Sequence, residues 1–178
     1  MQARFLVLAA AAGLTLAACG TAPIPSAPAQ RAQALLHATA VQQPVTGKAI
    51  EGEIDFDEMK DGGVRVSGSV RNLAPGSQVG FHIHEKGVCE GDGASAGGHY
   101  NPRGKRHGAP GKGHAGDLPM LHADARGTAT VDHVSRELDL AGIVGRGLIV
   151  HRDADDQKTD PTGNAGPRLA CGVIAVKS

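Results

Sequence analysis

Five of the nine histidines of this chain lie between Gly80 and Asp117, where their types and spacing suggest metal binding. In the segment GFHIHE, alternate side chains of a strand point to the same face, so His82 and His84 would present two imidazoles side by side. Phe81 would then face the other way. This arrangement predicts a pair of metal ligands on one strand.

A second group of potential ligands follows on a segment with almost no apolar residues. His99, His107, His114 and Asp117 are expected on loops, where they can converge on a second ion. Three imidazoles and one carboxylate form a closed tetrahedral zinc set. Further along the chain, His151 ends the apolar run GLIVH.

The elements that must position these residues are predicted to be short strands. Aromatic residues make up 2% of the chain, and it holds 26 glycines and 10 prolines, which favours short strands and long loops over helices. Alternating or β-branched segments are expected as strands at residues 49–58, 64–73, 79–85, 127–134, 145–151 and 170–176. The pattern predicts an all-β fold, a β-sandwich or flattened barrel with its chemistry on loops.

The N-terminal residues indicate export. Residues 1–18 contain a short apolar run that resembles a signal peptide, and Leu16 to Cys19 resembles a bacterial lipoprotein box in which Cys19 is lipidated. We expect residues 19–45 to form a flexible tether, with a possible short helix at residues 31–38, and residues 46–178 to form the folded domain. The protein is therefore expected in the periplasm or cell envelope, anchored to a membrane by lipid.

The cysteine count supports this interpretation. Setting aside Cys19 leaves Cys89 and Cys171, an even pair in an oxidising compartment. A bridge between them would stabilise the fold by roughly 4 to 5 kcal/mol, because it closes a loop of about 80 residues. It would also hold Arg168, three residues before Cys171, close to the pair His82 and His84.

Several function classes are disfavoured. The formal net charge is zero, and no basic stretch is interleaved with aromatic residues, so no nucleic-acid partner is expected. His84 and Glu85 are not continued into the metalloprotease motif HExxH. The glycines near Gly91 fit a dinucleotide fingerprint only loosely, and no amphipathic helix follows them.

Six separated motifs resemble, in the same order, those of the copper/zinc superoxide dismutases: GFHIHE, GGHYNP, KRHG, GHAGDL, GLIVH and GNAGPRLACGV. The resemblance runs from about Thr46 to Lys177. It implies a Greek-key, flattened eight-stranded barrel with long metal-binding and electrostatic loops. It further implies superoxide as substrate, converted to dioxygen and hydrogen peroxide by alternating reduction and oxidation of copper.

Carried over residue by residue, the resemblance implies one copper and one zinc ion per subunit. The copper ligands would be His82, His84, His99 and His151, and the zinc ligands would be His99, His107, His114 and Asp117. His99 would bridge the two ions and, with Arg168, which guides the substrate, take part in catalysis. Asp155 would link a copper ligand to a zinc ligand, and the family disulfide falls on Cys89 and Cys171.

The loop between His151 and Gly163 is acidic and departs from the commoner family pattern. His37, His122 and His133 lie outside every motif and are not expected to bind metal. A non-enzymatic copper or zinc buffer or carrier is the alternative function. A zinc hydrolase is disfavoured because four protein ligands leave no position for water. Whether the protein is a monomer or a homodimer stays open.

Overall fold

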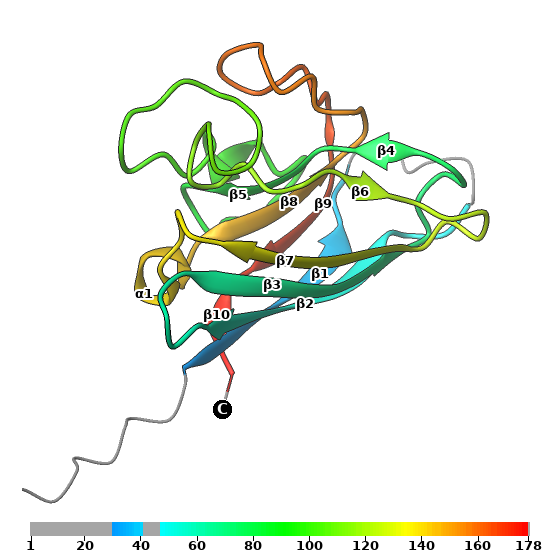
Figure 1. Ribbon diagram of the computed structural model, residues 1–178. Coiled ribbons are helices and arrows are strands. Elements are labelled where there is room, and N and C mark those ends of the chain that lie inside the picture. Colours follow the sequence, from blue (N-terminus) through cyan, green and yellow to red (C-terminus); the bar gives the residue numbers. More distant parts are fainter. Residues whose placement is uncertain (1–29, 41–46, 178) are drawn as a thin grey trace, which may run out of the picture.

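The computed structural model describes residues 30–40 and 47–177, which form a curled antiparallel β-structure (Figure 1). Its eight-stranded sheet has the order β5-β8-β9-β1-β2-β3-β7, with β10 paired to β1. A separate two-stranded sheet joins β4 and β6. The all-β prediction is confirmed, and the large sheet has the predicted number of strands. The strands are β1 (Arg31–Ala38), β2 (Glu51–Glu58), β3 (Val64–Arg71), β4 (Gln78–Val79), β5 (Phe81–His84), β6 (Leu121–His122), β7 (Ala129–Ser135), β8 (Gly147–His151), β9 (Arg168–Val173) and β10 (Ala175–Val176).

Helical structure in the described residues is limited to a 3-10 turn, η1 (Ala94–Ala96), and the four-residue helix α1 (Leu140–Ile143). None of the helices within residues 30–40 and 47–177 has the length and apolar character needed to cross a bilayer. The predicted signal peptide, residues 1–18, and the predicted lipidation site Cys19 lie outside the described residues.

The prediction of a tether with a possible helix was wrong for residues 31–38. They form β1, which pairs with β2, β9 and β10 and so lies inside the sheet. Its side chains alternate between the core and the outer face: Ala32, Ala34 and Leu36 are buried in the core, whereas Leu35 is 51% exposed. The folded domain therefore includes residues before the predicted start at residue 46.

The predicted strand at residues 79–85 is divided at Gly80. Val79 pairs with Leu121 of β6, whereas Phe81 pairs with Val150 of β8. The Gly80 N–H donates instead to the Asp153 carbonyl at 2.8 Å. Because of this break, β5 belongs to the large sheet. The loop after β8 lies beside Gly80, which directly precedes β5.

Two long loops lie on the same side of the molecule, next to β5 and β8 (Figure 1). The first runs from β5 to β6 and contains η1, and the second runs from β8 to β9. The core beneath them is formed by aliphatic side chains with two fully buried phenylalanines, Phe56 and Phe81. The rigid sheet thus presents β5 and the end of β8 to both loops.

Truncation of neighbouring leucines in β1 tests its assignment as an internal strand. We expect Leu36→Ala to lower the free energy of unfolding by about 2–5 kcal/mol, because its side chain is fully buried. Leu35→Ala, the matched control on the outer face, should change it by less than about 1 kcal/mol. Urea unfolding of both variants makes the comparison, and equal small losses would contradict the assignment.

Candidate metal centre

Strand β5 places the first histidines by its backbone. His82 and His84 are both completely buried within it. Single β-bridges pair His84 with His99 and His82 with Asp117, so the strand aligns a residue of the long loop beside each histidine. The His151 N–H donates to the Gly80 carbonyl at 2.8 Å, which fixes the end of β8 next to the start of β5.

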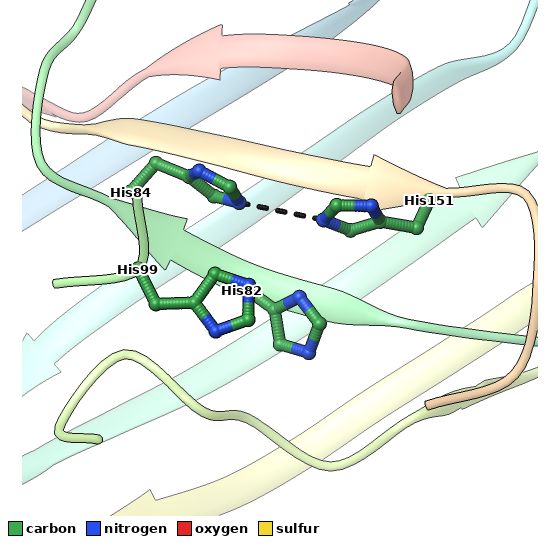
Figure 2. Close-up of side chains that lie close together, drawn as sticks. All are labelled: His82, His84, His99 and His151. Atoms are coloured by element: carbon green, nitrogen blue, oxygen red, sulfur yellow. Dashed lines mark hydrogen bonds between the residues drawn. The ribbon is translucent and has the colours of Figure 1, made fainter. Parts of the chain in front are cut away.

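Four histidines from these elements converge on one point (Figure 2). Their ligand nitrogens all lie within 4.8 Å of one another, and Nε2 of His84 is 3.3 Å from Nε2 of His151. The members of this group are His82, His84, His99 and His151. The structure therefore brings together all four residues that the sequence predicts as copper ligands.

Three of these rings are held by a hydrogen bond from their other nitrogen. His84 Nδ1 contacts the Gly97 carbonyl at 2.9 Å, and His151 Nδ1 contacts the Gly166 carbonyl at 3.0 Å. His82 Nε2 lies 2.7 Å from Asp155 Oδ2. Such contacts select the tautomer whose free nitrogen can bind a metal. Sequence reasoning missed both glycines, because a backbone carbonyl leaves no side-chain signature.

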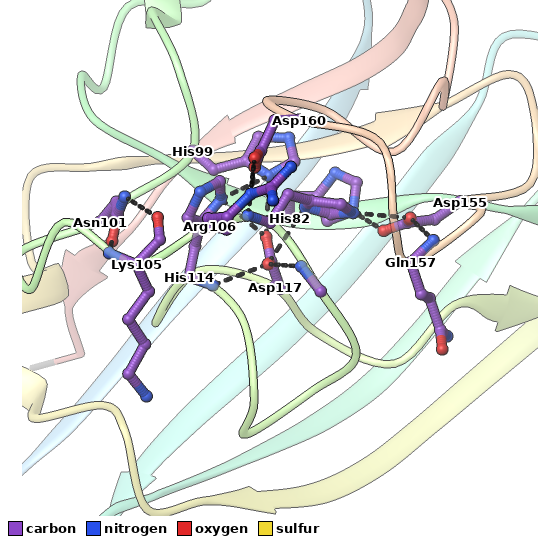
Figure 3. Close-up of polar contacts among 12 residues, drawn as sticks. His82, His99, Asn101, Lys105, Arg106, His114, Asp117, Asp155, Gln157 and Asp160 are labelled. Carbon is purple, nitrogen blue, oxygen red and sulfur yellow. Dashed lines mark hydrogen bonds and ion pairs between the residues drawn. The ribbon is translucent and has the colours of Figure 1, made fainter.

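A second group consists of His99, His107, His114 and Asp117, whose ligand atoms also lie within 4.8 Å of one another. Figure 3 labels His99, His114 and Asp117 of this group. Asp117 is at its centre: Oδ1 is 2.8 Å from His99 Nδ1 and 3.3 Å from His114 Nδ1. Its Oδ2 is 3.1 Å from His107 Nδ1. The predicted zinc ligands are thus gathered in one buried cluster.

His99 belongs to both groups. Its Nδ1 is directed at Asp117, and its Nε2 is buried without a hydrogen-bond partner in the part of the chain that the structure describes. The rings of His99 and His82 lie close together, with centroids 4.0 Å apart. The two ring nitrogens of His99 therefore face different groups of potential metal ligands.

The donor sets fit the two metals of the sequence prediction. Within the described residues, three of the four buried side-chain polar atoms that lack a hydrogen-bond partner are His82 Nδ1, His99 Nε2 and His107 Nδ1. An unpaired buried polar atom costs about 1–3 kcal/mol, which ligation of a metal would remove. Four imidazoles suit Cu(II), and three imidazoles with one carboxylate suit zinc.

Asp155 connects the two groups. One oxygen lies 2.7 Å from His82 Nε2 and the other 2.9 Å from His107 Nε2. The neighbouring aspartates have other partners, since Asp153 pairs with Arg152 and Asp156 accepts backbone N–H groups in its own loop. The structure thus places Asp155, rather than Asp153 or Asp156, between a predicted copper ligand and a predicted zinc ligand.

Arg168 is held beside the first group by the loop that contains η1. Its guanidinium donates to the carbonyls of Gly93 and Gly97, at 2.5 and 2.6 Å. The Gly97 carbonyl also accepts from His84, so one peptide group contacts both the arginine and a predicted copper ligand. The disulfide between Cys89 and Cys171 is formed, and it joins this loop to β9.

The aspartates of the acidic loop after His151 have polar partners, both within the loop and in neighbouring segments. Asp153, Asp155 and Asp156 have the partners given above, and Asp160 accepts from Arg106 and from the His107 N–H. The carboxylates therefore build the loop instead of forming an unpaired acidic surface. Asp160 was missed by the sequence interpretation, because its contacts join segments more than 50 residues apart.

The remaining histidines lie elsewhere in the sheet. His37 is in β1, His122 is exposed in β6, and His133 is in β7. In the described part of the chain, none of these three belongs to a cluster that could hold a metal.

Burial favours the neutral form of three site histidines, His82, His84 and His151. It lowers the pKa of His82 and His84 well below the usual value, and the charge of His99 adds to this effect. Burial also lowers the pKa of His151 to about 4. Burial alone would raise the pKa of Asp117, but its hydrogen bond with His99 and the charges of His107 and His99 lower it overall. Neutral imidazole and ionised carboxylate are the forms that bind metals.

These pKa values predict that the stability of the metal-free protein falls in acid. Between the ordinary histidine pKa of 6.5 and the value of about 4 for His151, the unfolded chain binds more protons than the folded one. Stability is therefore retained above the upper value and lost as the pH decreases through this window. Urea unfolding of chelator-treated protein measures it, and His151→Gln should reduce the slope. A free energy of unfolding that is constant over this range would contradict the assignment.

Comparisons with known proteins agree with this geometry. Residues 50–174 match the family described as copper/zinc superoxide dismutase. A crystal structure of the clock protein EA4 is similar, with 39% sequence identity, a TM-score of 0.71, and coverage of 83% of this chain and 94% of that one. A double mutant of a superoxide dismutase-like protein from Bacillus subtilis has 38% identity and a TM-score of 0.70, with 80% of this chain and 96% of that chain covered. The chain belongs to the copper/zinc superoxide dismutase family.

Proposed function

We propose that the protein is a superoxide dismutase that uses one copper and one zinc ion per subunit to convert superoxide to dioxygen and hydrogen peroxide. The observation that carries this proposal is the shared ring of His99, which presents one nitrogen to each buried donor group. A protein that only stored the two metals would not need a common ligand.

The two groups of predicted ligands indicate which residues would hold each metal. His82, His84, His99 and His151 would hold copper, and His99, His107, His114 and Asp117 would hold zinc. Copper supplies the one-electron exchange that dismutation needs, and zinc, which has no redox chemistry, supplies a fixed charge. Four zinc ligands leave no open position for a hydrolytic water, which disfavours a zinc hydrolase.

The protein's own residues would supply the proton for the reaction and attract the superoxide anion. Nε2 of His99 has no hydrogen-bond partner among residues 30–40 and 47–177, so it is the ring nitrogen that could hold a proton for the reduced product. Asp155 orients His82 and His107 by accepting from both rings. Arg168 keeps a permanent cation beside the copper group, where it attracts and orients a small anion.

A metal carrier with the same fold is the rival function. The printed names of the two structural relatives, a clock protein and a superoxide dismutase-like protein, do not themselves state dismutase activity. The arrangement of Arg168 favours the enzyme, because its guanidinium is fixed by two carbonyls, one of which also contacts His84. Storage of a metal gives no reason for such a cation.

We also propose that the protein is exported and anchored by a lipid at Cys19. The signal-like sequence of residues 1–18 supports export. The disulfide between Cys89 and Cys171 supports it as well, because such bonds persist in oxidising compartments. Metabolic labelling with a fatty acid should depend on Cys19, and an unlabelled mature protein would contradict the anchor.

Turnover tests the enzyme against the carrier. After reconstitution with copper and zinc, we expect the protein to remove superoxide with a rate above that of the same concentration of free copper. Stopped-flow decay of superoxide absorbance measures this rate. A rate no higher than that of free copper would support the carrier.

Removing the guiding cation tests Arg168. We expect Arg168→Ala to slow turnover by about tenfold or more and to flatten its dependence on ionic strength, because the attraction of the anion is lost. Arg168→Lys should retain part of both effects. Arg65→Ala, which removes a cation that pairs with Asp132 on the outer face of the sheet, is the control. Equal rates for the Arg168 and Arg65 variants would exclude the steering role.

A bridging imidazole predicts a magnetic signature. With Cu(II) bound in both groups, the two ions should be coupled through His99, and the electron paramagnetic resonance signal should be reduced. His99→Ala should restore two independent signals. Coupling that persists in this variant would place the bridge at another residue.

A further inference from the structure

The ring and the backbone of His107 are both held by one loop. At its ring, Nε2 lies 2.9 Å from Asp155 Oδ1. At its backbone, the N–H donates to Asp160 Oδ1 at 2.5 Å. Both carboxylates belong to the segment between β8 and β9, five residues apart, whereas His107 belongs to the other long loop. The two loops around the metal centre are therefore joined at this histidine.

The other oxygen of Asp160 accepts from Arg106 Nε at 2.5 Å. This ion pair is near solvent, since the side chain of Arg106 is 86% exposed and that of Asp160 is 35% exposed. Exposed ion pairs contribute little to stability. A hydrogen bond from a backbone N–H to a carboxylate is stronger, and losing it at the buried residue His107 would leave a donor unpaired. Of the two contacts of Asp160, the one with the His107 N–H is therefore expected to contribute more to holding the two loops together.

The rest of the loop transmits the position of Asp160 to Asp155. The Gly163 N–H donates to the Thr159 carbonyl at 2.7 Å, and the Asp156 N–H donates to the Gly163 carbonyl at 2.8 Å. Gly163 has a φ of +61°, and a Cβ there would lie 2.0 Å from Asp155 Oδ1 and 2.5 Å from His107 Nε2. The backbone thus packs directly against the contact between Asp155 and His107.

We propose that Asp160 is a positioning residue for the zinc site. By fixing the backbone of His107 to the loop that carries Asp155, it keeps His107 Nδ1 directed at Asp117, the oxygen of which is 3.1 Å away. Without Asp160, the backbone of His107 would no longer be joined to this loop, and the ring could shift as a whole relative to Asp117 and Asp155. This inference rests on the zinc site of the proposed function and assigns it a residue outside the ligand set.

Three variants separate the contacts of Asp160. Asp160→Ala removes both, Asp160→Asn retains an acceptor for the His107 N–H, and Arg106→Ala removes only the ion pair. We expect Asp160→Ala to weaken zinc binding by about 10–100-fold, measured by competition with a chelator, and to change the visible absorption of Co²⁺ bound at the zinc site. Asp160→Asn and Arg106→Ala should stay within about threefold of the unaltered protein, because the backbone contact survives.

Unchanged zinc affinity and Co²⁺ absorption in Asp160→Ala would overturn the inference. So would an equal loss in Arg106→Ala, because the exposed ion pair would then account for the effect. If Asp160→Ala does not fold, Asp160→Ser, whose hydroxyl is too short to reach the same position, takes its place with the same expectation. Failure of the unaltered protein to bind zinc would overturn the proposed function together with this inference, whereas binding that is insensitive to Asp160 overturns the inference alone.

Discussion

The site depends on one ring that has to serve two buried donor groups. His99 can do so because a β-bridge to His84 fixes its backbone against β5, and because Asp117 holds its Nδ1. The opposite nitrogen is then left unpaired among three other imidazoles. Loops alone could not position a ring to this degree, so the strand supplies the rigidity and the loops supply most of the ligands.

Carboxylates and backbone carbonyls around the ligands form the next layer of this arrangement. Asp155 selects the tautomers of His82 and His107, while the carbonyls of Gly97 and Gly166 select those of His84 and His151. These contacts fix the orientation of the rings before a metal arrives. This preorganisation costs stability in the metal-free protein, because buried nitrogens remain without partners, and metal binding recovers that cost.

The sequence predicted well which side chains come together around the site, because these side chains lie in recognisable motifs. It predicted the strands less well where tertiary pairing decides the conformation. Residues 31–38 are rich in alanine and leucine, which favour helix, yet hydrogen bonding to β2 and β9 makes them a strand. The carbonyl contacts of Gly97 and the role of Asp160 could not be predicted, since they depend on how the two long loops fold against each other.

The central claim is that two metal ions of different kinds share His99. A crystal structure of the reconstituted protein, with anomalous scattering measured at the copper and zinc absorption edges, tests it most directly. The account predicts copper among His82, His84, His99 and His151, zinc among His99, His107, His114 and Asp117, and the His99 ring between them. A single bound ion after full reconstitution, or two ions that do not both contact His99, would contradict it.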